Sequence, residues 1–175
     1  GATHLILDVP ELSIRTHEKH GTHSSKLISE LADYAHTKSS QINLSLNIDM
    51  LVHNHHFQLI EKMLSYINNT PINSIRIQDA GIISLINEIS PSKEIHLNTE
   101  TNNNNIESLS YFESLVSRQV LTNELPYGDI KKIVNKISSE FELQVHGPVL
   151  IQYAKRKFQN EIRSDIVEAN YEPGA

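Results

Sequence analysis

The chain has 175 residues, of which 38% are hydrophobic, and its formal net charge is −6 with histidine counted as neutral. This length and composition predict one globular domain over residues 1–175, and the charge argues against a protein that coats DNA. Because the chain has no cysteine, it cannot form a disulfide, a thiolate nucleophile, a zinc ribbon or an iron–sulfur cluster. No apolar run is long enough to span a bilayer and no signal peptide opens the chain, so no membrane partner is expected and the cytoplasm is the expected location.

Strand-like and helix-like spacings of apolar residues alternate along the chain. The first half predicts a strand at 3–9, a helix capped by Ser24, a strand at 42–48, a helix at 57–67 and a strand at 74–78. The second half predicts a helix at 82–89, a strand at 94–98, a helix at 106–116, a strand at 118–123, a helix with Pro126 in its first turn and a strand at 140–145. The expected apolar helix faces include Leu31, Tyr34, Leu115 and Val134. This alternation predicts a parallel sheet wound right-handedly.

Within the strands, polar and apolar residues occupy opposite faces. The apolar face carries Ile42, Leu44, Leu46, Ile75, Ile77, Ile95, Leu97, Phe141, Leu143 and Val145. The other face carries Asn43, Ser45, Asn47, Arg76, Gln78, His96, Asn98, Glu140, Glu142, Gln144 and His146. A doubly wound sheet is apolar on both faces, whereas a barrel with a polar interior has this one-sided pattern. Buried charges need partners, so Arg76 is expected to pair with Glu142 or Glu140.

The predicted fold is therefore an α/β, TIM-barrel-like parallel barrel of about six β/α units. A complete eight-unit barrel needs about 200 residues or more. We expect one strand–helix unit to be missing, most simply before Gly1, because the chain opens directly on its first strand. A Rossmann-type sheet is the alternative, but no G-x-G-x-x-G motif follows any predicted strand.

Polar residues stand where the strand-like runs stop. They are Asp8, Asn47 with Asp49, Asp79, Asn98 with Glu100, Glu124 and His146. The carboxyl ends of parallel strands share one rim, where active sites are usually built. The sequence therefore predicts that these residues converge on one site.

Six segments resemble, in order, the landmarks of the collagenase-like peptidase family. They are GATHLILDVPELSIRT, INLSLNIDMLVHN, IQDAGIISLI, IHLNTETNNNN, VLTNELPYGDI and FELQVHGPVLIQYAKRKF, and they cover nearly the whole chain. Each motif alone is weak, but the ordered set ending in E-x-x-V-H-G is specific. Members are TIM-barrel-like and were named as peptidases, yet the better-understood ones resemble bacterial proteins for tRNA uridine, ribosomal RNA cytidine or oxygen-independent ubiquinone hydroxylation. The resemblance implies a role in RNA modification, with tRNA as a partner.

The resemblance also implies positions for a site. The matching residues are Arg15, His53, Asn54, Asp79, Thr99, Glu100, Glu124, His146, Gly147 and Arg156. Those expected to be catalytic are Asp79, Glu100, Glu124 and His146; those expected to bind substrate are Arg15, His53, Asn54, Thr99 and Arg156. In this interpretation the rim binds a small anionic co-substrate or a flipped base. Arginine holds anionic oxygens, while His146 and Glu124 exchange protons.

The chain departs from many family members at two cysteine positions of an iron–sulfur ligand set. Leu150 and Lys157 stand there instead, so no cofactor is expected in this chain. The sequence looks like a shorter, cysteine-free branch that occurs beside a longer paralogue in Gram-positive bacteria. That paralogue is a second possible partner.

Several of these residues also have a purely structural interpretation. His53, His55 and His56 resemble metal ligands, but no carboxylate stands at a matching spacing, so no metal site is expected. Asp79 and Glu124 each precede a predicted helix and could cap it. His146 could simply bind a loop carbonyl. The basic residues could form a solvated face rather than a phosphate site: Lys155, Arg156, Lys157 and Arg163.

Three functions follow from these observations. The first is RNA modification at the rim, probed by comparing tRNA nucleosides between a deletion strain and its parent. The second is a non-catalytic binding or scaffold subunit that works with the longer paralogue. The third is proteolysis, as the family name suggests, although the chain has no cysteine, no H-E-x-x-H and no G-x-S-x-G.

Overall fold

The computed structural model describes residues 2–14, 25–39, 41–98 and 104–147. Its strands are β1 (His4–Asp8), β2 (Asn43–Ile48), β3 (Ser74–Ile77), β4 (Glu94–Asn98), β5 (Arg118–Leu121) and β6 (Glu140–Leu143). The α-helices are α1 (Ser25–Lys38), α2 (Phe57–Ile67), α3 (Ile83–Ile89), α4 (Ile106–Phe112) and α5 (Tyr127–Lys136). Three short 3₁₀ turns are η1 (Pro10–Leu12), η2 (Asn54–His56) and η3 (Ala80–Ile82).

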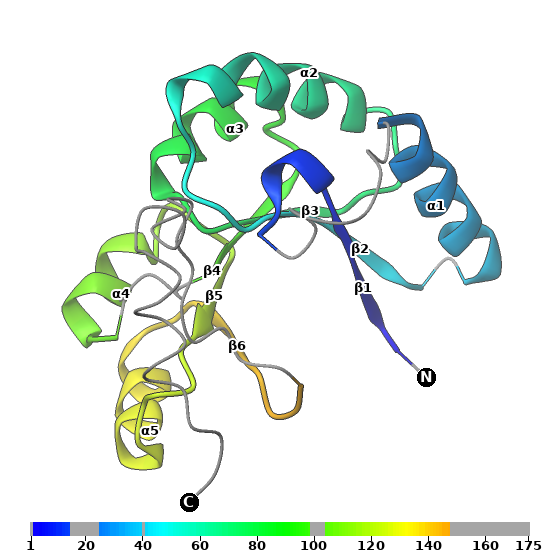
Figure 1. The fold of residues 1–175 in the computed structure, drawn as a ribbon. Coiled ribbons are helices and arrows are strands. Elements are labelled where there is room, and N and C mark those ends of the chain that lie inside the picture. Colours follow the sequence, from blue (N-terminus) through cyan, green and yellow to red (C-terminus); the bar gives the residue numbers. More distant parts are fainter. Residues whose placement is uncertain (1, 15–24, 40, 99–103, 148–175) are drawn as a thin grey trace, which may run out of the picture.

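The strands form one parallel sheet in the order β1-β2-β3-β4-β5-β6. Figure 1 shows this sheet curling into an open half-barrel with the helices on its outer side. Each strand lies beside the next one in the chain, and the order never reverses as it would in a Rossmann-type sheet. The predicted partial (β/α) barrel is thereby confirmed.

Several elements predicted from the sequence at the β5–β6 edge extend beyond the ends that the structure gives them. β5 ends at Leu121 and β6 at Leu143, two residues before the predicted ends of both strands. α4 ends at Phe112, whose carbonyl accepts hydrogen bonds from the backbone N–H groups of Leu115 and Val116. Pro126 is the N-cap of α5 with an extended backbone, rather than a residue of the first turn.

The main hydrophobic core lies between the outer face of the sheet and the helices. It includes Leu44, Leu46 and Ile48 of β2 and Ile75 and Ile77 of β3, all fully buried. A second, smaller cluster lies under the last two strands and is formed by Leu109, Leu121, Ile133 and Ile137. The one-sided apolar pattern of the strands therefore has its expected cause, which is contact with helices on one face only.

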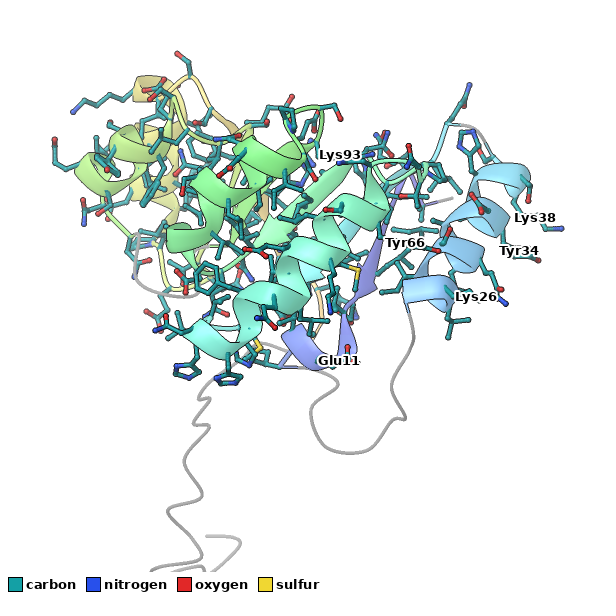
Figure 2. All side chains as sticks on the ribbon, turned by 90° about the horizontal axis from the view of Figure 1, so that it is seen from above. Glu11, Lys26, Tyr34, Lys38, Tyr66 and Lys93 are labelled. Carbon is teal, nitrogen blue, oxygen red and sulfur yellow. The ribbon has the colours of Figure 1, made fainter. Side chains whose placement is uncertain are left out.

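The apolar helix faces are narrower than predicted. Tyr34 on α1 is 62% exposed and Val134 on α5 is 52% exposed, while Leu31 and Leu115 are also exposed. Figure 2 shows Tyr34 on the outward side of α1 between Lys26 and Lys38. The ammonium of Lys38 lies 5.1 Å from the centre of the Tyr34 ring, so this aromatic residue contacts a cation instead of the core.

The concave face of the sheet carries one continuous polar row. Adjacent strands pair Asp8 with Asn47, Asn47 with Arg76, Arg76 with His96, His96 with Arg118, and Arg118 with Glu140. Because register neighbours on parallel strands point to the same side, these six side chains share the concave face. This row is the polar interior that the strand pattern predicted.

Candidate functional site

A hydrogen-bond network organises the carboxyl ends of β1 and β2. The side-chain amide of Asn47 donates to Asp8 Oδ1 at 2.6 Å and to Asp49 Oδ2 at 2.9 Å. Asp49 Oδ1 accepts the backbone N–H of Ile14 at 2.8 Å, and Asp8 Oδ1 accepts the Ser13 hydroxyl at 3.4 Å. Asn47 and Asp49 are both 1% exposed, so these buried polar groups fix the segment after η1 against the end of β2.

Asp79 follows β3 and joins two rim loops. Its Oδ1 accepts the Gly81 N–H at 2.8 Å and caps η3, while its Oδ2 accepts the Val52 N–H at 2.9 Å. The predicted capping role of Asp79 is therefore confirmed. A side chain at Gly81 would place its Cβ 3.0 Å from Asp79 Oδ1, so glycine allows this close approach. With both oxygens held by backbone donors, Asp79 is a group that positions the loop carrying His53 and Asn54.

The histidines after β2 contact one another. The rings of His53 and His55 stack with centroids 5.7 Å apart, and those of His55 and His56 are 3.9 Å apart. His56 is buried, and its Nδ1 accepts the backbone N–H of His53 at 3.0 Å. Across the described part of the chain, no three His, Cys, Asp or Glu side chains are arranged to hold a metal ion. His53 and Asn54 are exposed at the rim and line a hollow there together with Val52 and His55.

Glu124 and His146 lie beyond β5 and β6 at the same end of the sheet. Glu124 is exposed, and its backbone N–H donates to the Thr122 hydroxyl at 3.3 Å. The predicted capping role of Glu124 is wrong, because Pro126 occupies the N-cap of α5. His146 is exposed and precedes Gly147, whose φ of 120° is one that side-chain-bearing residues rarely adopt.

A hollow of about 380 Å³ lies between the first turn of α5 and the end of β6. His146 and Gly147 line it together with Asn123, Leu125, Tyr127, Ile130, Leu143, Gln144 and Val145. Tyr127 is 80% exposed and Val145 is 90% exposed, so the hollow has an apolar wall beside an imidazole.

The described rim residues lie at or just beyond the carboxyl ends of parallel strands: Asp8, Asn47, Asp79, Asn98, Glu124 and His146. They divide into the Asp8–Asp79 half, which carries the hydrogen-bond network, and the β5–β6 half, which carries Glu124 and His146. Arg15, Thr99, Glu100 and Arg156 lie outside the described residues. Their predicted roles stay predictions, as do the catalytic roles of the others.

The concave face below the rim is charged and paired. Arg76 Nη1 donates to Glu142 Oε1 at 2.7 Å, which confirms the first of the two predicted partners. Glu140 pairs instead with Arg118, whose Nη2 lies 2.6 Å from its Oε2, and this pair lowers the pKa of Glu140. His96 is 3% exposed, and burial lowers its pKa although its Nε2 lies 3.2 Å from Glu94 Oε2.

Of three inner amide side chains, Asn47 and Asn98 were predicted at the rim from the sequence, whereas Gln78 was not singled out as a site residue. Asn47, Gln78 and Asn98 each keep a buried amide oxygen without a partner in the described residues. The signal was available, because all three fall on the polar alternate positions of predicted strands. The alternation does not show which of these groups form hydrogen bonds with one another.

The profile of peptidase family U32 matches residues 1–168, and the chain belongs to this family. An uncharacterised protease of Methanocaldococcus jannaschii is 24% identical over 163 residues, which are 90% of this chain and 39% of that protein. The tRNA hydroxylation protein P1 of Bacillus subtilis is 26% identical over 74% of this chain and 30% of its own length. The tRNA hydroxylation protein P of Escherichia coli is 24% identical over 89% of this chain and 34% of its own length.

The chain thus spans well under half the length of the curated relatives it matches. No solved structure matches it significantly. Among the described residues, no helix combines the length and apolar character needed to cross a membrane.

Proposed function

We propose that this chain acts in the hydroxylation of tRNA, with uridine as the modified nucleoside. The observation that supports this most directly is that relatives aligned over 74% and 89% of the chain are named tRNA hydroxylation proteins. The half-barrel also presents polar groups from six strand ends at one rim, where barrel enzymes carry their chemistry. With tRNA as the partner, the cytoplasm is the location that we propose.

The residues at the rim have distinct roles in this proposal. Exposed His146 and Glu124 transfer or position protons, and Glu100 joins them. Arg15 and Arg156 hold the oxygens of a small anionic co-substrate, while His53, Asn54 and Thr99 contact the substrate. Asp79 acts by positioning, since its two oxygens already accept the backbone N–H groups of Val52 and Gly81.

An iron–sulfur cluster of the kind found in many family members does not fit this chain. Such clusters are held by cysteine thiolates, and the chain contains none. No step of the proposed function is therefore assigned to a cluster held by this chain. A longer paralogue acting with the chain would have to supply any such group.

The test uses a strain that lacks the gene for this chain. Mass spectrometry of its tRNA nucleosides should show loss of hydroxylated uridine, and expression of the parent chain should restore it. A His146→Ala, Glu124→Ala double variant should fail to restore it, while an exposed helix variant such as Asn135→Ala should succeed. Both double-variant positions are exposed, so circular dichroism should show an intact fold.

The scaffold function predicts the opposite result. Full restoration by the folded double variant would end the catalytic proposal and leave a binding role beside the paralogue. Unchanged tRNA nucleosides in the deletion strain would reject tRNA hydroxylation altogether.

A further inference from the structure

Among the described residues, three buried acceptor atoms on the concave face have no hydrogen-bond donor. They are Asn47 Oδ1, Gln78 Oε1 and Asn98 Oδ1, contributed by β2, by the residue after β3 and by the last residue of β4. Asn47 is 1% exposed and Asn98 is 2% exposed. A buried acceptor that has lost water and gained no donor lowers stability, and native proteins keep few of them. Three on neighbouring strands of one face point to a missing donor.

The orientation of Asn47 is fixed by its neighbours. Its Nδ2 donates to two carboxylates, Asp8 at 2.6 Å and Asp49 at 2.9 Å. Exchanging the nitrogen and oxygen would place Oδ1 against both carboxylates, which is unfavourable. The unpartnered atom of Asn47 is therefore its oxygen, as the hydrogen-bond network requires.

The carboxylates around these oxygens have partners: Asp8 and Asp49 accept hydrogen bonds from Asn47, and Glu142 forms an ion pair. Asn98 pairs in register with Val120, and Val120 with Glu142, so Glu142 belongs to the same row of the concave face. The guanidinium of Arg76 holds that carboxylate at 2.7 Å. Because these carboxylates already have donors, the free amide oxygens suit a neutral N–H donor better than a free cation.

We propose that Gln78 and Asn98, with Asn47 deeper on the same face, form the pocket that reads the N–H group of the substrate nucleobase. The proposal rests on the proposed function, which brings a nucleoside to this rim. Side chains on neighbouring strands about 4.8 Å apart can both reach the edge of one planar base. Asparagine and glutamine amides commonly pair with base edges.

The test titrates the ¹⁵N-labelled full chain with uridine and with 3-methyluridine. These ligands differ at one position. In 3-methyluridine a methyl group replaces the hydrogen of the ring N–H, which is the donor that the amide oxygens would accept a hydrogen bond from. Uridine should shift the side-chain amide resonances of Gln78 and Asn98. It should leave Gln119 unchanged, because that residue pairs with Leu97 on the helix-facing side and also has an unpartnered oxygen. 3-Methyluridine should bind about tenfold more weakly, as expected for one lost hydrogen bond.

Two matched variants extend the test. Asn98→Leu should weaken uridine binding about tenfold. Asn87→Leu, at an exposed position of α3, should bind like the parent chain. If Asn98→Leu does not fold, the comparison of the two nucleosides on the parent chain decides alone. Equal affinity for both nucleosides, absence of binding, or shifts confined to Gln119 would overturn the proposal.

The outcome is separable from that of the proposed function. Selective uridine binding by a chain that does not restore tRNA hydroxylation in cells would uphold this pocket and reject the function. Restoration of hydroxylation without the N–H preference would uphold the function and reject the pocket.

Discussion

Arg76 on β3 reaches across the concave face to Glu142 on β6, with its Nη1 2.7 Å from Glu142 Oε1. The two residues are 66 positions apart in the chain, and two further strands lie between theirs in the sheet. The Arg76 side chain is 9% exposed, whereas that of Glu142 is 36% exposed. This pair therefore links the two halves of the curled sheet through their interior.

We expect Glu142→Gln to lower the free energy of unfolding by about 1–3 kcal/mol, because it leaves a buried guanidinium without its counter-ion. The matched control is Glu140→Gln, which breaks a similar pair with Arg118 whose acidic side chain is 69% exposed. Glu140→Gln should lower the free energy of unfolding less than Glu142→Gln does, since water screens exposed pairs. Urea unfolding of both variants measures the difference, and equal losses would contradict the role given to the buried pair.

Stability should fall as the pH drops below the ordinary pKa of histidine, 6.5, because His96 has a lowered pKa in the folded chain. In this window the unfolded chain binds a proton that the folded chain does not, which favours unfolding. The loss continues down to the folded pKa of His96. Urea unfolding between neutral and mildly acidic pH should give a shallower slope for His96→Gln, and an unchanged slope would contradict the prediction.

Gly147→Ala should destabilise the chain by about 1–3 kcal/mol and reduce restoration of tRNA hydroxylation. The reason is its φ of 120° and a Cβ that would lie 3.1 Å from Gln144 Nε2, next to His146. Gly128→Ala is the control, because a Cβ there meets nothing within 4 Å and the residue lies in α5. That change should be neutral or stabilise by up to about 1 kcal/mol. Thermal unfolding distinguishes the two.

Asp79→Ala should cost about 1–2 kcal/mol through the lost cap and should speed amide exchange at both Val52 and Gly81. These two N–H groups are the donors that its carboxylate accepts. Glu124→Ala should change stability by less than about 0.5 kcal/mol, because Glu124 is exposed. Hydrogen exchange followed by NMR checks both, and protected Val52 in Asp79→Ala would refute the loop-positioning role.

His146→Ala should lower the rate of tRNA hydroxylation about 10²–10⁴-fold, as expected for loss of a general acid or base. Arg156→Ala should instead weaken co-substrate binding by roughly 1.5–3 kcal/mol and retain part of the activity. Higher expression or excess co-substrate should then rescue Arg156→Ala and not His146→Ala. Rescue of both variants alike would contradict this division of roles.

The spacing of apolar residues predicted the architecture, because burial of one sheet face against helices leaves a clear alternation of apolar and polar residues along each strand. Ser45, Asn47, Arg76 and His96 occupy the concave face as that alternation required. Strand ends were less predictable at β5 and β6, where pairing stops before the apolar run does. The partner choice of Arg76 depended on register between strands far apart in sequence, and the alternation alone could not distinguish Glu142 from Glu140.

The candidate site was predictable by position but less so by role. Asp79 was expected both to cap and to act at the rim, and its contacts with Val52 and Gly81 define only the first of these. Glu124 was expected to be able to cap a helix, but the turn before α5 gives that place to Pro126. Such roles depend on backbone directions within loops, which apolar spacing does not encode.

The division of the core into two clusters has a consequence for motion. The β5–β6 end has its own small cluster of Leu109, Leu121, Ile133 and Ile137, separate from the large cluster under β1–β4. A unit with few buried contacts opens at lower free energy than the rest of a domain. We therefore expect the half of the sheet that carries Glu124 and His146 to open at lower free energy than the half that carries Asp79, with the Arg76–Glu142 pair as the side-chain link that resists this opening.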